Sequence, residues 1–159
     1  MVASTRYSIQ QLSASDVGLM KALLSVFGQA FNELETYEGA MPGAAYLEGL
    51  LASRHFIALA AIQDGSVIGG LAAYELAKFE QERSEIYIYD LAVTQAHRRR
   101  GVATALIGEL RGIGAARGAY VIFVQADRGD DPAIALYSKL GVREEVLHFD
   151  IRVDHPPSG

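Results

Sequence analysis

Residues 85–106 read EIYIYDLAVTQAHRRRGVATAL, in which an apolar run, a block of cations and a second apolar run follow one another. The first run, 85–93, predicts a strand, and Val102 and Leu106 begin the apolar stripe of a helix predicted over 101–117. The cations therefore lie at a strand-to-helix turn, and the helix that follows them begins with small residues.

The pattern Arg98-x-x-Gly101-x-Ala103 at this turn suits an anion. A helix N-terminus exposes free backbone N–H groups and a partial positive charge, where a phosphate or pyrophosphate fits. Gly101 and Ala103 leave room for that ligand to reach the backbone. Two other interpretations stay open: a solvated helix start with surface arginines, and a nucleic-acid patch, which the lack of interleaved aromatic residues disfavours.

Composition limits the function further. The chain has 159 residues, a formal net charge of −5 and no cysteine. Disulfides, thiolate zinc sites and cysteine nucleophiles are therefore excluded, and the acidity argues against a general nucleic-acid binder and favours a cationic partner. Because the beginning of the chain lacks the apolar core of a signal peptide and no apolar run could span a bilayer, we expect a soluble cytoplasmic protein.

The other elements are predicted from apolar periodicity and turn residues. Ser13 or Ser15 is expected to cap the first helix, and Asp130 or Asp131 the last. Their order predicts a mixed α/β fold with an antiparallel first half and a β-α-β second half. The predicted strands cover 6–12, 55–62, 66–78, 84–93, 119–126 (buried) and 142–153, the helices 15–31, 44–53, 101–117 and 131–140, and a loop 35–43.

A second motif lies in DDPAIALYSKLGV (130–142), where Leu136 and Tyr137 share the apolar face of the helix. Taken alone, Tyr137 is more simply a core aromatic. Together with the arginine–glycine turn, however, the sequence resembles the GCN5-related N-acetyltransferases. Their acetyl-CoA motif matches Arg98 to Ala103, and their following motif matches AIALYSKLGV, with a departure at Asp130, where many members have asparagine.

This resemblance implies an α/β fold with a mixed central sheet, splayed between the fourth and fifth strands and flanked by about four helices. It covers a core of about 5–152. The length of the chain suits a single domain over 1–159, and the composition of DHPPSG predicts a flexible tail at 154–159. The resemblance extends to the aminoglycoside 3-N-acetyltransferases of type I, the gentamicin-modifying group. That group implies transfer from acetyl-CoA to the 3-amino group of the 2-deoxystreptamine ring, antibiotic resistance and a homodimer.

The resemblance also implies which residues bind the cofactor. The pantetheine arm pairs with the end of the strand, where the N–H of Val93 polarises the thioester carbonyl. Tyr137 gives a proton to the departing thiolate. The expected cofactor contacts are Leu91, Ala92, Val93, Arg98, Arg99, Arg100, Gly101, Val102, Ala103, Thr104, Asp130, Ala133 and Tyr137.

Asp90 is the favoured base, because an unpaired carboxylate inside the apolar run IYIYDLAV is costly unless it has a use. It can take the proton of the amine directly or through water. Three alternatives remain: Asp90 faces solvent, pairs with an arginine, or only holds a substrate ammonium. Its side-chain direction cannot be read from alternation, since a bulge would shift the parity.

An aminoglycoside carries several ammonium groups, which call for several carboxylates on one wall. Acidic residues cluster in 80–85, 127–131 and 144–150, although each cluster can equally be a solvated surface. The expected substrate contacts are Tyr87, Asp90, Asp127, Glu85, His148 and Asp150. Weaker candidates, in the loop expected to cover the acceptor side, are Glu35, Tyr37 and Glu38.

The sequence leaves other functions open. The acceptor can be a polyamine or a protein amine, or the chain can be a non-catalytic acyl-CoA-binding or nucleotide-sensing module. Retention of both Asp90 and Tyr137 argues against the non-catalytic reading. No His or Asp spacing suggests a metal, and no Ser-His-Asp arrangement is evident.

Overall fold

The computed structural model describes residues 6–157. The chain separates into two compact units, Met1–Gln125 and Ala126–Gly159. The first unit holds the central sheet and the helices packed on it, and the second holds one helix and the C-terminal segment. The single domain expected over 1–159 stays a prediction.

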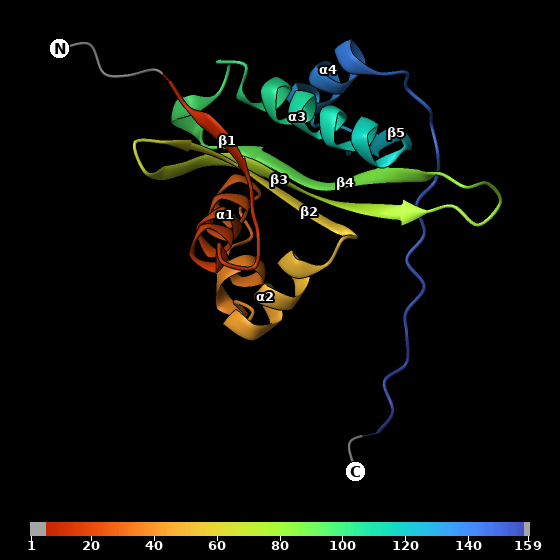
Figure 1. Ribbon diagram of the computed structural model, residues 1–159, viewed down its shortest axis with the longest axis horizontal. Helices are drawn as coiled ribbons and strands as arrows, with labels where there is room; N and C mark the ends of the chain where they lie inside the picture. Colours follow the sequence, from red (N-terminus) through yellow and green to blue (C-terminus); the bar gives the residue numbers. More distant parts are fainter. Residues whose placement is uncertain (1–5, 158–159) are drawn as a thin grey trace. The chain divides into compact units, whose positions relative to one another are not determined.

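The first unit is built on a five-stranded sheet in the order β1-β2-β3-β4-β5 (Figure 1). Neighbours from β1 to β4 run antiparallel, whereas β4 and β5 run parallel. The predicted mixed α/β sheet is confirmed. The strands are β1 Ser8–Gln11, β2 Phe56–Gln63, β3 Ser66–Ala77, β4 Ser84–Val93 and β5 Ala119–Val124.

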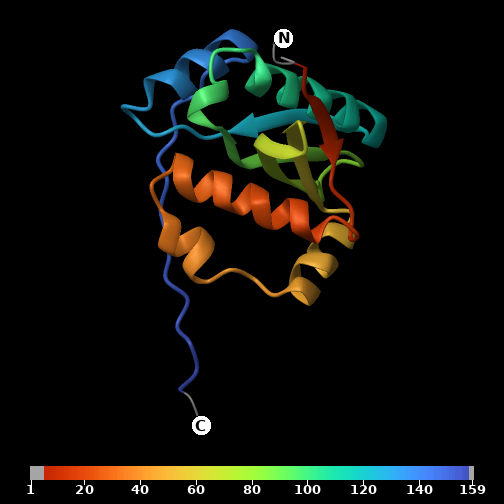
Figure 2. The same cartoon turned by 90° about the vertical axis from the view of Figure 1, so that its left-hand side faces the viewer.

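Helices cover both faces of this sheet. α1 (Val17–Ala30) and α2 (Ala44–Ala52) lie on one face, and α3 (Val102–Arg117), which connects β4 to β5, lies on the other (Figures 1 and 2). On the α1 face, Leu23 and Phe27 are buried against small residues of the strands. Two short turns join these elements, the π-helix η1 (Glu35–Gly39) and the 3₁₀ turn η2 (Gln95–His97).

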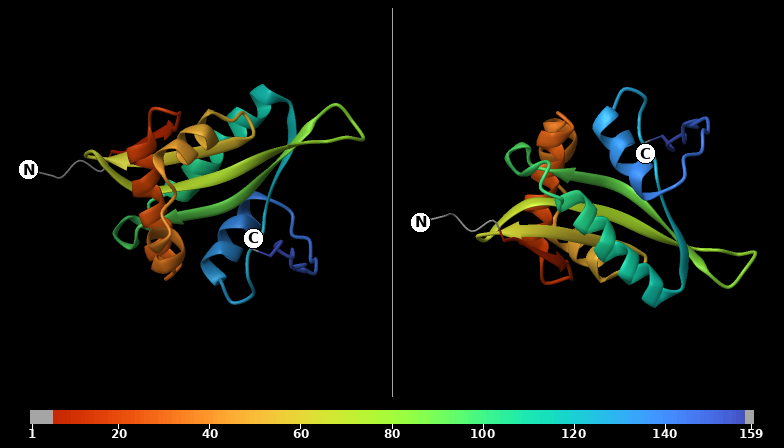
Figure 3. Two further views of the ribbon diagram at one scale, coloured as in Figure 1. Left: turned by 90° about the horizontal axis from the view of Figure 1, so that it is seen from below. Right: turned by 90° about the horizontal axis from the view of Figure 1, so that it is seen from above.

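The sheet opens between β4 and β5. Their parallel pairing begins at Ser84 with Ala119 and ends at Ile88 with Val124, while β4 continues to Val93. On its other side β4 stays paired with β3 as far as Gly69 opposite Val93. The splay expected between the fourth and fifth strands is therefore confirmed. At the opposite end of β4, the β3–β4 hairpin projects from the sheet (Figure 3).

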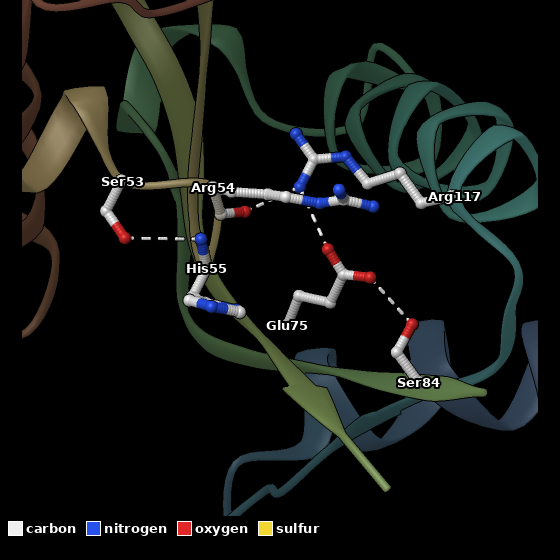
Figure 4. Close-up of polar contacts among 6 residues, drawn as sticks. All are labelled: Ser53, Arg54, His55, Glu75, Ser84 and Arg117. Atoms are coloured by element: carbon white, nitrogen blue, oxygen red, sulfur yellow. Dashed lines mark hydrogen bonds and ion pairs between the residues drawn. The ribbon is translucent and has the colours of Figure 1, made fainter. Parts of the chain in front are cut away.

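A buried polar cluster ties the closed end of this sheet to α3 (Figure 4). Glu75 of β3 is only 7% exposed, and its carboxylate accepts hydrogen bonds from Ser84 Oγ at 2.7 Å and Arg117 Nη1 at 3.0 Å. Arg117 also donates to the carbonyl oxygen of Arg54 at 2.7 Å. Burial alone would raise the pKa of Glu75, but these hydrogen bonds hold the pKa below its ordinary value.

In the second unit, α4 (Asp131–Leu140) begins as predicted, with Asp130 as its N-cap. The strand predicted over 142–153 is wrong, because the chain from 142 to 157 has no regular structure and its residues are exposed. The segment does alternate like a strand, with Leu147, Phe149 and Ile151 separated by polar residues. Alternation makes a strand only where a neighbouring backbone completes the hydrogen-bond ladder, and no ladder is formed here within the described residues.

Three smaller expectations are also corrected. The last position before α1 is Asp16 rather than Ser13 or Ser15; its carboxylate accepts a hydrogen bond from the N–H of Ser13 at 2.8 Å instead of capping the helix. The loop expected over 35–43 contains the η1 turn. β5 ends at Val124 and is partly exposed, because it is an edge strand with β4 on one side only.

Between residues 6 and 157, no helix has the length and apolar character needed to cross a bilayer.

Candidate active site

Asp90 owes its direction to a β-bulge in β4. Ile88 lies opposite Ala73 but Asp90 lies opposite Ala72, so Tyr89 is an extra residue without a partner of its own. Regular alternation would place Asp90 with Ile88 and Ile86, the buried side that meets α3. The bulge instead turns Asp90 towards the α1 face, and this answers the question of parity that the sequence left open.

On that face the carboxylate of Asp90 is half-buried and hydrogen-bonded to a tyrosine. Tyr37 Oη, from η1, donates to Asp90 Oδ2 at 2.9 Å. Among the described residues the carboxylate thus has a tyrosine partner and no arginine partner. Burial raises the pKa of Asp90, the nearby Glu33 adds to the rise, and the Tyr37 hydrogen bond opposes it. A carboxylate with a raised pKa is a better proton acceptor than a free one.

Asp90 lines a cavity of about 160 Å³ between the sheet and the helices α1 and α2. Aromatic rings form one side of it. Tyr89 makes edge contacts with Tyr74 at 6.0 Å and with Tyr87 at 5.8 Å, between ring centroids. Tyr87 in turn stacks on Phe123 at 4.7 Å. A row of rings beside a carboxylate suits a cationic acceptor, through cation–π contacts and charge.

Of the predicted acceptor contacts in the first unit, Tyr87 contacts the ring of Tyr89 but does not itself line the cavity of Asp90. Its hydroxyl donates to Gln125 Oε1 at 3.1 Å. Glu85 stands two residues earlier on the same side of β4, but its carboxylate already has partners, Lys78 Nζ at 3.8 Å and the hydroxyl of Tyr120 at 3.2 Å. Glu35 is exposed, and the side chain of Glu38 lies outside the described residues.

A second cavity, of about 150 Å³, lies where β4 has left β5. It is lined by Val26, Gln29 and Ala30 of α1 and by the chain from Val93 to Arg98. Arg98 Nε donates to the carbonyl oxygen of Val93 at 3.1 Å and holds the turn against the strand. Of the three residues predicted to bind the pantetheine arm, Ala92 and Val93 are buried and Leu91 is half-buried.

The start of α3 has the features of an anion site. Its N-cap, Gly101, has a φ of 78°, and no side chain caps the helix among the described residues. The first helical hydrogen bond runs from Ala105 N–H to the Gly101 carbonyl, so the N–H groups of 102–104 point out of the helix end without a partner in residues 6–157. A Cβ on Gly101 would meet nothing within 4 Å, which shows open space beside the turn. The exposed Arg99 and Arg100 flank it.

The second unit holds the other predicted residues. Asp130 accepts a hydrogen bond from the N–H of Ala133 at 3.3 Å, which is a capping role. Tyr137 is half-buried on α4, and burial together with the charge of Asp130 raises the pKa of its hydroxyl. Asp127 is exposed, while His148 Nε2 and Asp150 Oδ1 contact each other at 2.9 Å. Whether these residues share a site with Asp90 stays a prediction.

Sequence reasoning ranked Tyr37 among the weaker candidates and did not find Glu33 or Tyr74. The tyrosine is 53 positions from Asp90, and no local pattern joins them. A grouping of three or more His, Asp or Glu side chains able to hold a metal is not found in the described part of the chain.

Comparison with known proteins places this geometry in a family. Residues 19–142 match the model of the acetyltransferase (GNAT) family. An aminoglycoside acetyltransferase from an uncultured soil metagenomic sample is 66% identical over 94% of this chain and 100% of its own, with a TM-score of 0.93. Another such enzyme from a soil metagenomic sample, solved in complex with sisomicin, is 29% identical over 93% of this chain and 97% of its own, with a TM-score of 0.86.

A ribosomal-protein-alanine N-acetyltransferase from Brucella melitensis biovar Abortus 2308 is 25% identical over 94% of this chain and all of its own, with a TM-score of 0.73. No curated protein sequence matches significantly. The family match spans the strands β2 to β5, the turn at Gly101 and α4. The chain therefore belongs to the GNAT family of acetyltransferases, the enzymes that use acetyl-CoA as acetyl donor.

Proposed function

We propose that this protein transfers the acetyl group of acetyl-CoA to the 3-amino group of the 2-deoxystreptamine ring of aminoglycosides such as gentamicin, and so gives antibiotic resistance. The observation that carries the proposal is the half-buried Asp90 carboxylate, turned by the bulge onto an aromatic face at the splayed end of the sheet. The 66% identical aminoglycoside acetyltransferase and the 29% identical one solved with sisomicin support the choice of acceptor.

In this proposal the donor lies along the turn and the open strand. The free N–H groups at the start of α3 and the arginines beside them bind the pyrophosphate of coenzyme A. The pantetheine arm pairs with Leu91, Ala92 and Val93, where β5 has left a strand edge open. The remaining proposed contacts of the donor are Asp130, Ala133 and Tyr137, on α4 and its cap.

The reaction then follows from the chain's own groups. Asp90 accepts the proton of the attacking amine, directly or through water. The N–H of Val93 donates to the thioester oxygen as the amine attacks. Tyr137, whose raised pKa keeps its hydroxyl protonated, supplies the proton that the departing thiolate takes. Tyr87, Glu85, Asp127, His148 and Asp150 are the proposed contacts of the other ammonium groups.

The direct test is release of thiol from acetyl-CoA with gentamicin, sisomicin, kanamycin, spermidine and an unstructured peptide as acceptors. The proposal expects turnover with gentamicin and sisomicin and, by NMR of the product, acetylation at the 3-amine. Acetylation at another amine would refute the regiochemistry. Turnover with spermidine or the peptide alone would replace the acceptor and leave the acetyl transfer in place.

We also propose that the protein forms a homodimer. The exposed C-terminal segment supports this, since Leu147, Phe149, Ile151 and Val153 are 83, 77, 89 and 76% exposed and a second copy would cover them. Sedimentation of the wild-type protein is expected to give a dimer, and Phe149→Asp with Ile151→Asp a monomer. A wild-type monomer at micromolar concentration would contradict the proposal.

A further inference from the structure

We propose that Tyr37 is a positioning residue for the base: its hydroxyl holds one oxygen of the Asp90 carboxylate so that the other oxygen faces the acceptor amine. The inference rests on the proposed acetyl transfer, and it adds a role for η1 in that reaction. Tyr37 Oη donates to Asp90 Oδ2 at 2.9 Å, while Asp90 Oδ1 has no hydrogen-bond partner in residues 6–157. A carboxylate that accepts a hydrogen bond at Oδ2 keeps both lone pairs of Oδ1 free to accept a proton.

Tyr37 is placed by α1 and not by the strand that carries Asp90. Its ring packs against Phe27 at 6.1 Å and Phe31 at 6.0 Å, between centroids. The backbone N–H of Tyr37 donates to the carbonyl oxygen of Glu33 at 3.2 Å. The N–H of Glu33 in turn donates to the carbonyl oxygen of Gly28 at 2.8 Å. The hydroxyl therefore reaches Asp90 from a rigid support, which is what a positioning group needs.

Gly28 makes the close approach of η1 to α1 possible. A Cβ added there would come within 3.1 Å of Tyr37 Cβ and 3.5 Å of Leu34 Cδ2. Such a contact is tight, so an alanine at this position would push η1 outward by a few tenths of an ångström. The path from Gly28 through Tyr37 to Asp90 can thus be disturbed without removing the hydroxyl.

The surroundings of Asp90 disfavour its charged form, and the Tyr37 hydrogen bond acts against them. Burial raises the pKa of its carboxyl, and the Glu33 carboxylate raises it further. The other titratable groups beside it are the phenols of Tyr74 and Tyr87, whose pKa values are raised by burial and in part by Asp90, and the adjacent Tyr89. Among the described residues no cation offsets these effects, and the Tyr37 hydrogen bond is the contact that lowers the pKa of Asp90.

The test uses Tyr37→Phe, which keeps the ring and its packing. The pKa of Asp90, followed by NMR of carboxyl-labelled aspartate and assigned with Asp90→Asn, is expected to rise, because the hydrogen bond that favours the charged form is lost. Turnover with gentamicin is expected to fall about tenfold, because the carboxylate is no longer held towards the amine, with the KM for acetyl-CoA unchanged. Tyr7→Phe, a tyrosine placed before β1, is the matched control and is expected to behave as wild type.

Gly28→Ala is the second variant, since it keeps the hydroxyl and moves it; it is expected to give a smaller change in the same direction. An Asp90 pKa that does not move in Tyr37→Phe would overturn the inference, and so would wild-type turnover in that variant. A wild-type protein that acetylates no aminoglycoside would refute the proposed function instead, and the NMR titration would still report on the contact.

Discussion

The buried cluster around Glu75 makes a quantitative prediction about stability. In Arg117→Met the aliphatic part of the side chain is kept, but the Glu75 carboxylate loses the cation that is hydrogen-bonded to it and keeps the Ser84 hydrogen bond and the more distant charge of Arg54. Breaking a fully buried pair costs about 3–5 kcal/mol. Because Arg117 is 22% exposed and Glu75 7%, water compensates part of the loss, and we expect about 2–3 kcal/mol of unfolding free energy.

The assay is thermal and urea unfolding of wild type, Arg117→Met, Glu75→Gln and the double variant. A loss of that size lowers the melting temperature by about 4–12 °C for a chain of this length. The double variant is expected to recover much of the loss, because an uncharged glutamine beside methionine no longer needs a cation.

The pH dependence separates the ion pair from simple packing. The pKa of Glu75 is lowered in the folded protein, so its contribution is complete above the ordinary value of 4.5 and is lost as the pH falls below it. In Arg117→Met the same carboxyl protonates at a higher pH. The difference between the two proteins should therefore narrow below about pH 5. A loss under about 1 kcal/mol, or one that is constant between pH 4 and 7, would refute the reasoning.

Three further predictions concern the site. Asp90→Asn is expected to lower kcat/KM by about 10²–10⁴-fold, and an unchanged pH–rate profile would remove Asp90 as the base. The same variant is expected to raise the melting temperature at neutral pH, because a carboxyl whose pKa is raised by folding costs stability once the pH exceeds that pKa. Tyr137→Phe should lower kcat about 10²-fold with little change in acetyl-CoA affinity by calorimetry, and equal losses in both would indicate a packing role. Gly101→Ala, at a φ of 78°, should lower the free energy of unfolding by about 1 kcal/mol and weaken acetyl-CoA binding. The control Gly108→Ala, inside α3, should raise the free energy of unfolding by about 0.5–1 kcal/mol and leave binding unchanged. Similar behaviour of the two variants would show that the turn does not need glycine.

Much of this fold follows from local pattern. The apolar run at 84–93 and the stripe at 101–117 predict β4 and α3 closely, since periodicity and turn residues act over a few positions. The turn at Gly101 could be found because a glycine between a predicted strand and a predicted helix marks a helix start, and Gly101 is the N-cap of α3. These features need no information about distant residues.

What the sequence could not supply depends on contacts between distant segments. The bulge at Tyr89 arises from the register between β3 and β4, and the Tyr37 hydrogen bond spans 53 positions. The strand predicted over 142–153 was wrong for the opposite reason. Its alternation is local and correct for a strand, but a strand also needs a neighbour, and no pattern within 142–153 can provide one.

The extra residue at Tyr89 has a consequence for how this enzyme can change. On the N-terminal side of it, β4 keeps Ile86 and Ile88 in the core; on the C-terminal side, the same strand turns Asp90 into the cavity beside α1 and α2. Deleting that single residue would bring Ile88 and Asp90 next to each other and still leave Asp90 opposite Ala72, on the face that it occupies now. What sends Asp90 to the other face is a slip of β4 by one residue past β3, with the extra residue straightened into the strand. The direction of the carboxylate therefore depends on the register with β3, and a designer who transplants it to another sheet must transplant that register with it.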